Sequence, residues 1–383
     1  MSTFRSIECL RAWMAWWVVL AHALEFSGAA STGIGLRIPR TLVYLASSGA
    51  SAVRVFIIVS GFVIAHLILQ KREPYAHYLT RRFFRIAPIY VVGIILAIIV
   101  TNFYRTAFID LPFATDRDFR LARLLEQKAH FWTHLMVHAT LLHGMIPNNV
   151  LPFAATTFLS AAWSLSLEWQ FYLIAPALIA VVFYSRLNAV VVAFALLVLR
   201  IVLQGQSVVE WSHDAFFFLA ADYFMVGILC RLALEQTATG ARKFELLIPA
   251  TFLLLNEDRN AAFIWIVFYG IALYESGIIK IGNASIRKFI GFFALNEKLA
   301  LLGKWSYSTY LIHLSVFSIF VGIYASIVGV KNVTQMEVVG ILIATIPVIA
   351  VLSAILYRYI EAPSMQLGRN LISRRLDSLK SPV

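Results

Sequence analysis

Two ionisable side chains interrupt the first long apolar stretch of the chain, CLRAWMAWWVVLAHALEF (residues 9–26). Arg11 and His22 are eleven residues apart, which places them on one face of a helix and about 16 Å apart along its axis. Ionisable groups are costly inside a bilayer and usually line a protein interior or an aqueous cavity. A guanidinium binds anionic groups, and a neutral imidazole is the commonest general base.

This spacing predicts a site for a long donor that is anionic at one end and reactive at the other. Coenzyme A thioesters have that form, with phosphates at one end and the acyl group at the other. A simpler interpretation is also open, in which Arg11 pairs with Glu8 and His22 pairs with Glu25, each about one helical turn away.

A second basic pair, Arg82 and Arg85, lies at the start of the third apolar stretch. Residues at i and i+3 share a helix face, and guanidinium groups bind phosphate through two parallel hydrogen bonds. The pair is therefore expected to bind the phosphates of a donor, together with Arg11. The alternative is that these arginines only mark the cytoplasmic end of a membrane span.

One acidic residue, Glu168, lies near the start of the fourth apolar stretch, where a carboxylate is costly unless it is paired or protonated. We predict that it orients His22 and stabilises the imidazolium, which is the role of the acid in a catalytic triad. The alternative is a structural ion pair with Arg54 or Arg200. Arg54 itself could also extend its charged end to the membrane interface.

The elements that must position these residues are membrane helices. Of 383 residues, 60% are hydrophobic and only 14% are charged, which is the composition of an integral membrane protein. Stretches of roughly twenty apolar residues predict an all-α bundle of about ten spans. The expected ranges are 8–27, 51–70, 83–102, 161–184, 189–206, 214–234, 245–256, 261–279, 306–328 and 336–357.

The distribution of basic residues gives the orientation. With both termini in the cytoplasm, the cytoplasmic side carries more than twice as many Lys and Arg residues as the outer side. The short apolar segment 131–147 is therefore expected to be interfacial or re-entrant, because a crossing there would invert every later loop. The net charge of +12 follows from this asymmetry, and nucleic-acid binding is not expected.

Two further features limit the interpretation. Cys9 and Cys230 form no disulfide framework or zinc-ribbon spacing. A cleaved signal peptide is not expected, because Glu8 and Arg11 fall where its apolar core would begin.

Ser60 and Gly61, small residues inside the second stretch, favour a close approach of helices.

Four histidines follow one another in HFWTHLMVHATLLH (residues 130–143). His130, His134 and His138 share one helix face, and His143 follows. Such spacing is familiar in metal sites, so a histidine-cluster membrane oxygenase is an alternative function. The other histidines are widely scattered, and we instead expect an outward-facing interfacial helix without a metal. A solute or lipid carrier is a further alternative, although no inverted repeat is visible.

Several motifs in order resemble those of the acyltransferase-3 family of integral membrane acyltransferases. After the Arg-x10-His pair come FIIVSGFVI (56–64), RRFFRIAPIY (81–90), WSLSLEWQFYLIAP (163–176), WSYSTYLIH (305–313) and YIEAP (359–363). Many members carry two adjacent aromatics before Ser-Gly-Phe, and this chain has an isoleucine, Ile57, in the second of those positions. The likeness is greatest to bacterial exopolysaccharide and lipopolysaccharide O-acetylases.

The resemblance implies a membrane domain over residues 1–365, followed by a basic cytoplasmic tail over 366–383. It implies transfer of an acetyl or other short acyl group from acetyl-CoA or a related acyl-CoA to a saccharide or lipid-linked saccharide. The protein would lie among the lipids of the bacterial inner membrane. It would hold the donor with Arg11, Arg82 and Arg85, and use His22 as base.

Overall fold

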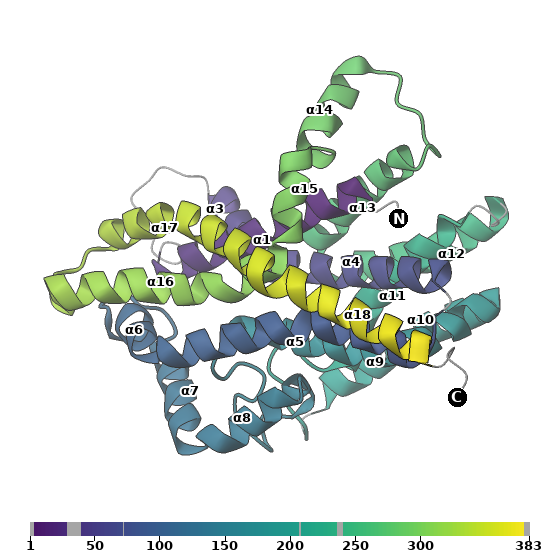
Figure 1. Cartoon of the computed structure of the whole chain (residues 1–383). Helices are drawn as coiled ribbons and strands as arrows, with labels where there is room; N and C mark the ends of the chain where they lie inside the picture. The colour runs from purple at the N-terminus through teal and green to yellow at the C-terminus, as the bar shows by residue number, and fades with distance from the viewer. Residues whose placement is uncertain (1–3, 29–39, 72, 207, 236–239, 379–383) are drawn as a thin grey trace.

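The computed structural model describes residues 4–28, 40–71, 73–206, 208–235 and 240–378, and within them it contains helices and connecting loops only (Figure 1). The longer helices are α1 (Arg5–Phe26), α4 (Gly49–Gln70), α5 (Tyr75–Ile99), α9 (Trp163–Tyr184), α10 (Arg186–Gly205), α11 (Phe217–Ala233), α12 (Gly240–Glu257), α13 (Arg259–Glu275), α16 (Ser306–Val328), α17 (Gln335–Leu356) and α18 (Ala362–Ser378). The shorter ones are α3 (Arg40–Ser47), α6 (Thr101–Arg105), η1 (Thr106–Asp110), α7 (Arg117–Ala129), α8 (Phe131–Ala139), η2 (His143–Met145), η3 (Ser160–Ala162), α14 (Ala284–Ala294), α15 (Glu297–Lys304), η4 (Val330–Asn332) and η5 (Tyr357–Glu361).

A helix lies in each of the ten predicted ranges, so the all-α prediction is confirmed for the described residues. In the part of the chain that the structure describes, seven helical stretches are long and apolar enough to cross a membrane, which makes this a multi-pass membrane protein. The three ranges outside these seven correspond to α11, α12 and α13. At 1.5 Å per residue, the 17 residues of α11 or α13 extend about 26 Å, slightly less than a bilayer core. The ten-span topology and the cytoplasmic termini stay predictions.

Helix α13 nevertheless runs from one end of the neighbouring helices to the other. At its start, Asp258 caps the helix and accepts a hydrogen bond from Ser51 near the beginning of α4 (2.7 Å). At its end, Glu275 accepts a hydrogen bond from the hydroxyl of Ser6 near the beginning of α1 (2.6 Å). Because α1 and α4 begin at opposite ends of the bundle, α13 has the reach of a full span.

The predicted close approach at Gly61 is confirmed. Gly61 of α4 and Gly227 of α11 lie in the contact between these two helices, which run side by side (Figure 1). A Cβ atom at Gly61 would collide with the carbonyl of Phe224, and one at Gly227 would collide with the carbonyl of Ile58. Membrane helices associate largely through such close packing, because lipid supplies no hydrophobic drive between them.

The segment after α7 folds into the bundle. The prediction that its histidines face outward is wrong for three of them, since His134, His138 and His143 are 0–1% exposed. The chain turns back after α8, so the rings of His138 and His143 stack at 4.0 Å. Both rings also contact the hydroxyl of Tyr90 on α5, at 2.7 and 3.3 Å.

The C-terminal helix returns to the bundle. Helices α17, η5 and α18 form one continuous path that crosses over α5 (Figure 1, yellow). Gly368 of α18 packs directly on the ring of Phe84 in α5. Helix α18 thus contacts the bundle at Gly368, and the division into a membrane domain over 1–365 and a basic tail over 366–383 stays a prediction.

Candidate active site

A cavity of about 400 Å³ lies among α1, α4, α5, α9, α11, α16 and α18. Four of the five predicted site residues line it, namely Arg11, Arg82, Arg85 and Glu168. The cavity gathers side chains from seven helices that are distributed along the whole sequence. The fifth predicted residue, His22, is not part of the cavity wall.

One end of the cavity is rich in positive charge. Six basic residues line it, and they are Arg11, Lys71, Arg81, Arg82, Arg85 and Arg369. Among the described residues, only two acidic ones share the wall, Glu8 and Glu168. Glu8 forms a long ion pair with Arg11 (3.8 Å), as the simpler interpretation of Arg11 predicted, and Glu73 outside the wall pairs with Arg81. The remaining cations exceed the carboxylates available to neutralise them.

The pKa of Lys71 reflects this excess. Burial and the positive charges of Arg81, Arg82 and Arg369 together lower the pKa of Lys71 from the value usual for lysine. Like charges so close repel one another, and an anionic group bound among them would relieve that repulsion.

Two tyrosines hold the arginines in place. The guanidinium groups of Arg11 and Arg85 lie over the ring of Tyr307, at 5.1 and 5.0 Å from its centre. Arg82 lies over the ring of Tyr172 at 5.8 Å. Arg11 also donates a hydrogen bond to Ser306 (3.1 Å). Cation–π contacts of this kind position a cation without neutralising it.

Glu168 belongs to this arginine-rich end. Its carboxylate accepts hydrogen bonds from Ser60 (2.8 Å), Tyr307 (2.6 Å) and Tyr172. His22, which we expected Glu168 to orient, contacts His313 instead. The reason is that α9 begins deep in the bundle, after the inward-folded segment, so Glu168 lies level with the first turn of α16.

The histidine pair lies farther along α1. Nδ1 of His22 is 2.8 Å from Nε2 of His313, and the two rings stack with their centres 5.0 Å apart. His313 is fully buried. Glu25 pairs with Arg120 of α7 (2.9 Å), so it is not the partner that the simpler interpretation gave to His22.

Tyr310 connects the cavity to this pair. It lines the cavity, shares a hydrogen bond with Ser164 (3.0 Å) and makes an edge contact with Phe56 (6.3 Å between ring centres). Its ring is also 6.2 Å from that of His313, three residues along α16. The arginine-rich end, the cavity and the histidine pair therefore follow one another along α1 and α16.

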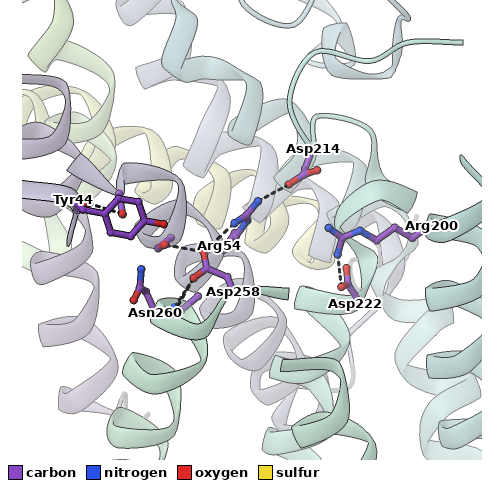
Figure 2. Close-up of polar contacts among 10 residues, drawn as sticks. Tyr44, Arg54, Arg200, Asp214, Asp222, Asp258 and Asn260 are labelled. Atoms are coloured by element: carbon purple, nitrogen blue, oxygen red, sulfur yellow. Dashed lines mark hydrogen bonds and ion pairs between the residues drawn. The ribbon is translucent and has the colours of Figure 1, made fainter. Parts of the chain in front are cut away.

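The arginines of the opposite end have acidic partners. Arg54 pairs with Asp258 (2.9 Å) and Asp214 (3.7 Å), and Arg200 pairs with Asp222 (2.5 Å), as Figure 2 shows. These pairs exclude the two ion pairs considered for Glu168. They also give Arg54 a structural role in joining α4, the loop before α11 and the start of α13.

Sequence reasoning assigned no role to several side chains of the site. Tyr307, Tyr310 and His313 recur every three residues in WSYSTYLIH, which is the spacing of one helix face and was the available signal. Arg369 carried no comparable signal. Among the residues described, no group of three or more His, Cys, Asp or Glu side chains is arranged to hold a metal ion.

The sequence profile of the acyltransferase-3 family, described as an acyltransferase domain, matches residues 4–357. No curated protein and no solved structure matches the chain significantly. The matched region contains all the predicted site residues and nearly the whole bundle. With its apolar helices and its family profile, the chain belongs to the acyltransferase-3 family and is a membrane acyltransferase.

Proposed function

We propose that this acyltransferase moves an acetyl or other short acyl group from cytoplasmic acyl-CoA to a hydroxyl of an exported saccharide, in the bacterial inner membrane. The observation that carries the proposal is the order of groups along α1. Arg11 lies in the arginine-rich end of the cavity, and His22 lies three turns farther on, against His313. One helix thus joins an anion-binding region to a candidate base.

The donor's phosphates would bind at the arginine-rich end. No carboxylate among the described residues forms an ion pair with Arg82, and its Nε is buried without a hydrogen-bond partner. Arg85 likewise contacts a tyrosine ring and the sulfur of Met365. Guanidinium groups with free donors suit phosphate, which accepts bidentate hydrogen bonds.

Glu168 has a positioning role in this proposal. Its carboxylate holds the hydroxyls of Tyr307 and Tyr172, whose rings lie under the three donor-binding arginines. A glutamine in its place would keep the shape but weaken these hydrogen bonds, because a charged acceptor binds a hydroxyl more strongly. Glu168 would then affect donor affinity more than the chemical step.

The chemistry requires one base and no change of oxidation state. The extended arm of the donor would run along the cavity past Tyr310 and bring the thioester to His22. His22 would remove the proton from the acceptor hydroxyl as its oxygen attacks the thioester carbonyl. The carbon–sulfur bond then breaks, and the departing thiolate takes the proton from the imidazolium. General-base help of this kind is typically worth about 10²–10⁴ in rate.

The saccharide acceptor is supported by the resemblance of the motifs to bacterial polysaccharide O-acetylases. Its side of approach is supported by the predicted orientation of α1, whose second half faces away from the cytoplasm. A hydroxyl that arrives from outside would reach His22 without passing the donor.

The test is acyl transfer from labelled acetyl-CoA in proteoliposomes that contain a surface-polysaccharide precursor. His22→Ala should abolish transfer and leave donor binding unchanged. His130→Ala is the matched control, because this histidine is exposed and pairs with Glu126, one turn earlier on the same helical segment. Transfer by His22→Ala at the wild-type rate would refute the role of His22 as base.

A further inference from the structure

The contact between His22 and His313 determines which nitrogen of each ring carries the proton. Nδ1 of His313 is 3.2 Å from the carbonyl oxygen of Thr309, one turn earlier on the same helix. A carbonyl oxygen can only accept a hydrogen bond, so Nδ1 of His313 must donate. In a neutral ring, the other nitrogen, Nε2, is then an acceptor.

The same reasoning extends to His22. Its Nδ1 lies 2.8 Å from Nε2 of His313, and a hydrogen bond at this distance needs one donor. Because Nε2 of His313 accepts, Nδ1 of His22 must donate. Neutral His22 therefore carries its proton on Nδ1 and keeps a lone pair on Nε2.

The surroundings favour neutral rings. His313 is fully buried, and its other ring neighbours are Tyr310 and Phe317. The nearest acid on the neighbouring turn of α1, Glu25, is engaged by Arg120. A buried imidazolium without a carboxylate partner would be costly, so the direction of the two hydrogen bonds is fixed by burial as well as by the Thr309 carbonyl.

We propose that His313 is a positioning residue that holds His22 in the tautomer with a free Nε2 and aims that nitrogen away from α16. The inference rests on the proposed function, in which Nε2 of His22 is the base. The chain of three groups, carbonyl, His313 and His22, has the arrangement of a catalytic triad with a neutral imidazole in place of the usual carboxylate. A neutral partner orients the base without placing a permanent negative charge inside the membrane, where such a charge is expensive.

The proton transfer is balanced within this series of hydrogen-bonded groups. When Nε2 of His22 takes the acceptor's proton, Nδ1–H of His22 still donates to Nε2 of His313. The imidazolium is thus stabilised by a hydrogen bond while His313 stays neutral. The proton returns to the thiolate from Nε2, and neither Nδ1 proton moves.

Two variants of His313 separate positioning from packing. His313→Gln introduces an amide oxygen that can accept a hydrogen bond from Nδ1–H of His22, whereas His313→Phe fills the space and offers no acceptor. We expect His313→Phe to lower kcat at least 10²-fold with the donor KM unchanged, and His313→Gln to stay within about tenfold of wild type. In a serine protease, loss of tautomer control costs about 10⁴ in rate. Equal activities of the two variants would refute the positioning role.

A second measurement needs no variant of His313 and no turnover. ¹⁵N spectra of histidine-labelled protein in lipid, with His22→Gln used to assign the signal, should show His22 protonated at Nδ1 and unprotonated at Nε2. The opposite tautomer would overturn the proposal. This readout also separates the two proposals, because a fully active His22→Ala enzyme would refute the proposed role of His22 as base while the tautomer result would stand.

Discussion

The arginines at the two ends of the bundle have different partners. At the end that contains the cavity, Arg82 and Arg85 lie over tyrosine rings, and the nearby carboxylate, Glu168, is occupied by hydroxyl groups. At the other end, Arg54 and Arg200 form short ion pairs with aspartates. Both ends use tyrosine rings, since Arg54 and Arg200 also lie over Tyr223, at 5.8 and 5.4 Å.

The difference shows how a membrane protein separates structural cations from ligand-binding ones. A buried arginine with an aspartate beside it is neutralised within the fold, and its removal leaves a buried charge. An arginine that rests on an aromatic ring is positioned but keeps its charge for a partner. The expected effects of substitution therefore differ in kind, stability at one end and donor affinity at the other.

The largest effect is expected at the end where Arg54 and Arg200 are paired with aspartates, which we call the paired end. Arg200→Ala removes the ion-pair partner of Asp222, which is 1% exposed, and should lower the free energy of unfolding by about 3–5 kcal/mol. Thermal melts in detergent would measure it. The double variant Arg200→Met with Asp222→Leu is the control and should recover most of the loss. Equal melting temperatures for the single variant and wild type would contradict the comparison.

The next effect is expected in the cavity. Arg82→Gln should weaken coenzyme A binding roughly 10- to 100-fold, because a hydrogen bond to a charged group is worth about 1.5–3 kcal/mol. Its melting temperature should be unchanged without ligand, since no ion pair is broken. Isothermal titration calorimetry would measure the affinity, with Arg54→Gln as the matched control. That control should show the opposite pattern, a lower melting temperature with unchanged affinity.

A smaller effect is expected at the mouth of the cavity. Arg369 is exposed and lines the wall from α18, outside the matched family domain. Arg369→Gln should weaken coenzyme A binding about threefold at low salt and less at high salt, because exposed charges are screened. Arg358→Gln, about three turns earlier in η5 and outside the cavity wall, should leave the affinity unchanged. A salt-independent loss would mean that α18 acts through packing alone.

The smallest effect concerns pH and the paired end. Burial raises the pKa of Asp258, but hydrogen bonds from Ser51, Ala261 and Arg54 outweigh it, so the pKa is lower than usual. Asp258 therefore contributes stability above its unfolded-state pKa, and this contribution disappears as the pH falls through the lower folded-state value. Melting temperatures between pH 7 and about 3 should fall less steeply for Asp258→Asn than for wild type. Parallel curves would show that this group does not contribute.

The sequence predicted what depends on local periodicity. The helices follow from apolar stretches, and the shared faces of Arg11 with His22 and of Arg82 with Arg85 follow from helix geometry. These residues did prove to lie along one cavity or beside its end. The family could also be recognised from the order of its motifs, and the profile match confirms it.

The sequence could not predict what depends on how deeply each helix begins. Glu168 was expected near His22 because its helix was taken to start at the membrane surface. The inward-folded segment before α9 makes this helix begin deeper in the bundle, and Glu168 therefore contacts Tyr307. The partner of His22 depends on the packing of α1 against α16, and the position of Arg369 depends on the return of α18 over α5. These are contacts between distant segments that no local pattern encodes.

The contact between Gly61 and Gly227 also has a consequence for biogenesis. The two glycines are separated by more than 160 residues, so during synthesis α4 enters the membrane long before the helix against which it packs. Arg54, on the same helix, also lacks its ion-pair partners at this stage, because Asp214 and Asp258 follow it in the sequence by 160 and 204 residues. Helix α4 must therefore stay in the bilayer with its packing surface for α11 uncovered and with the charge of Arg54 not neutralised. The bundle can close only when the second half of the chain has been inserted.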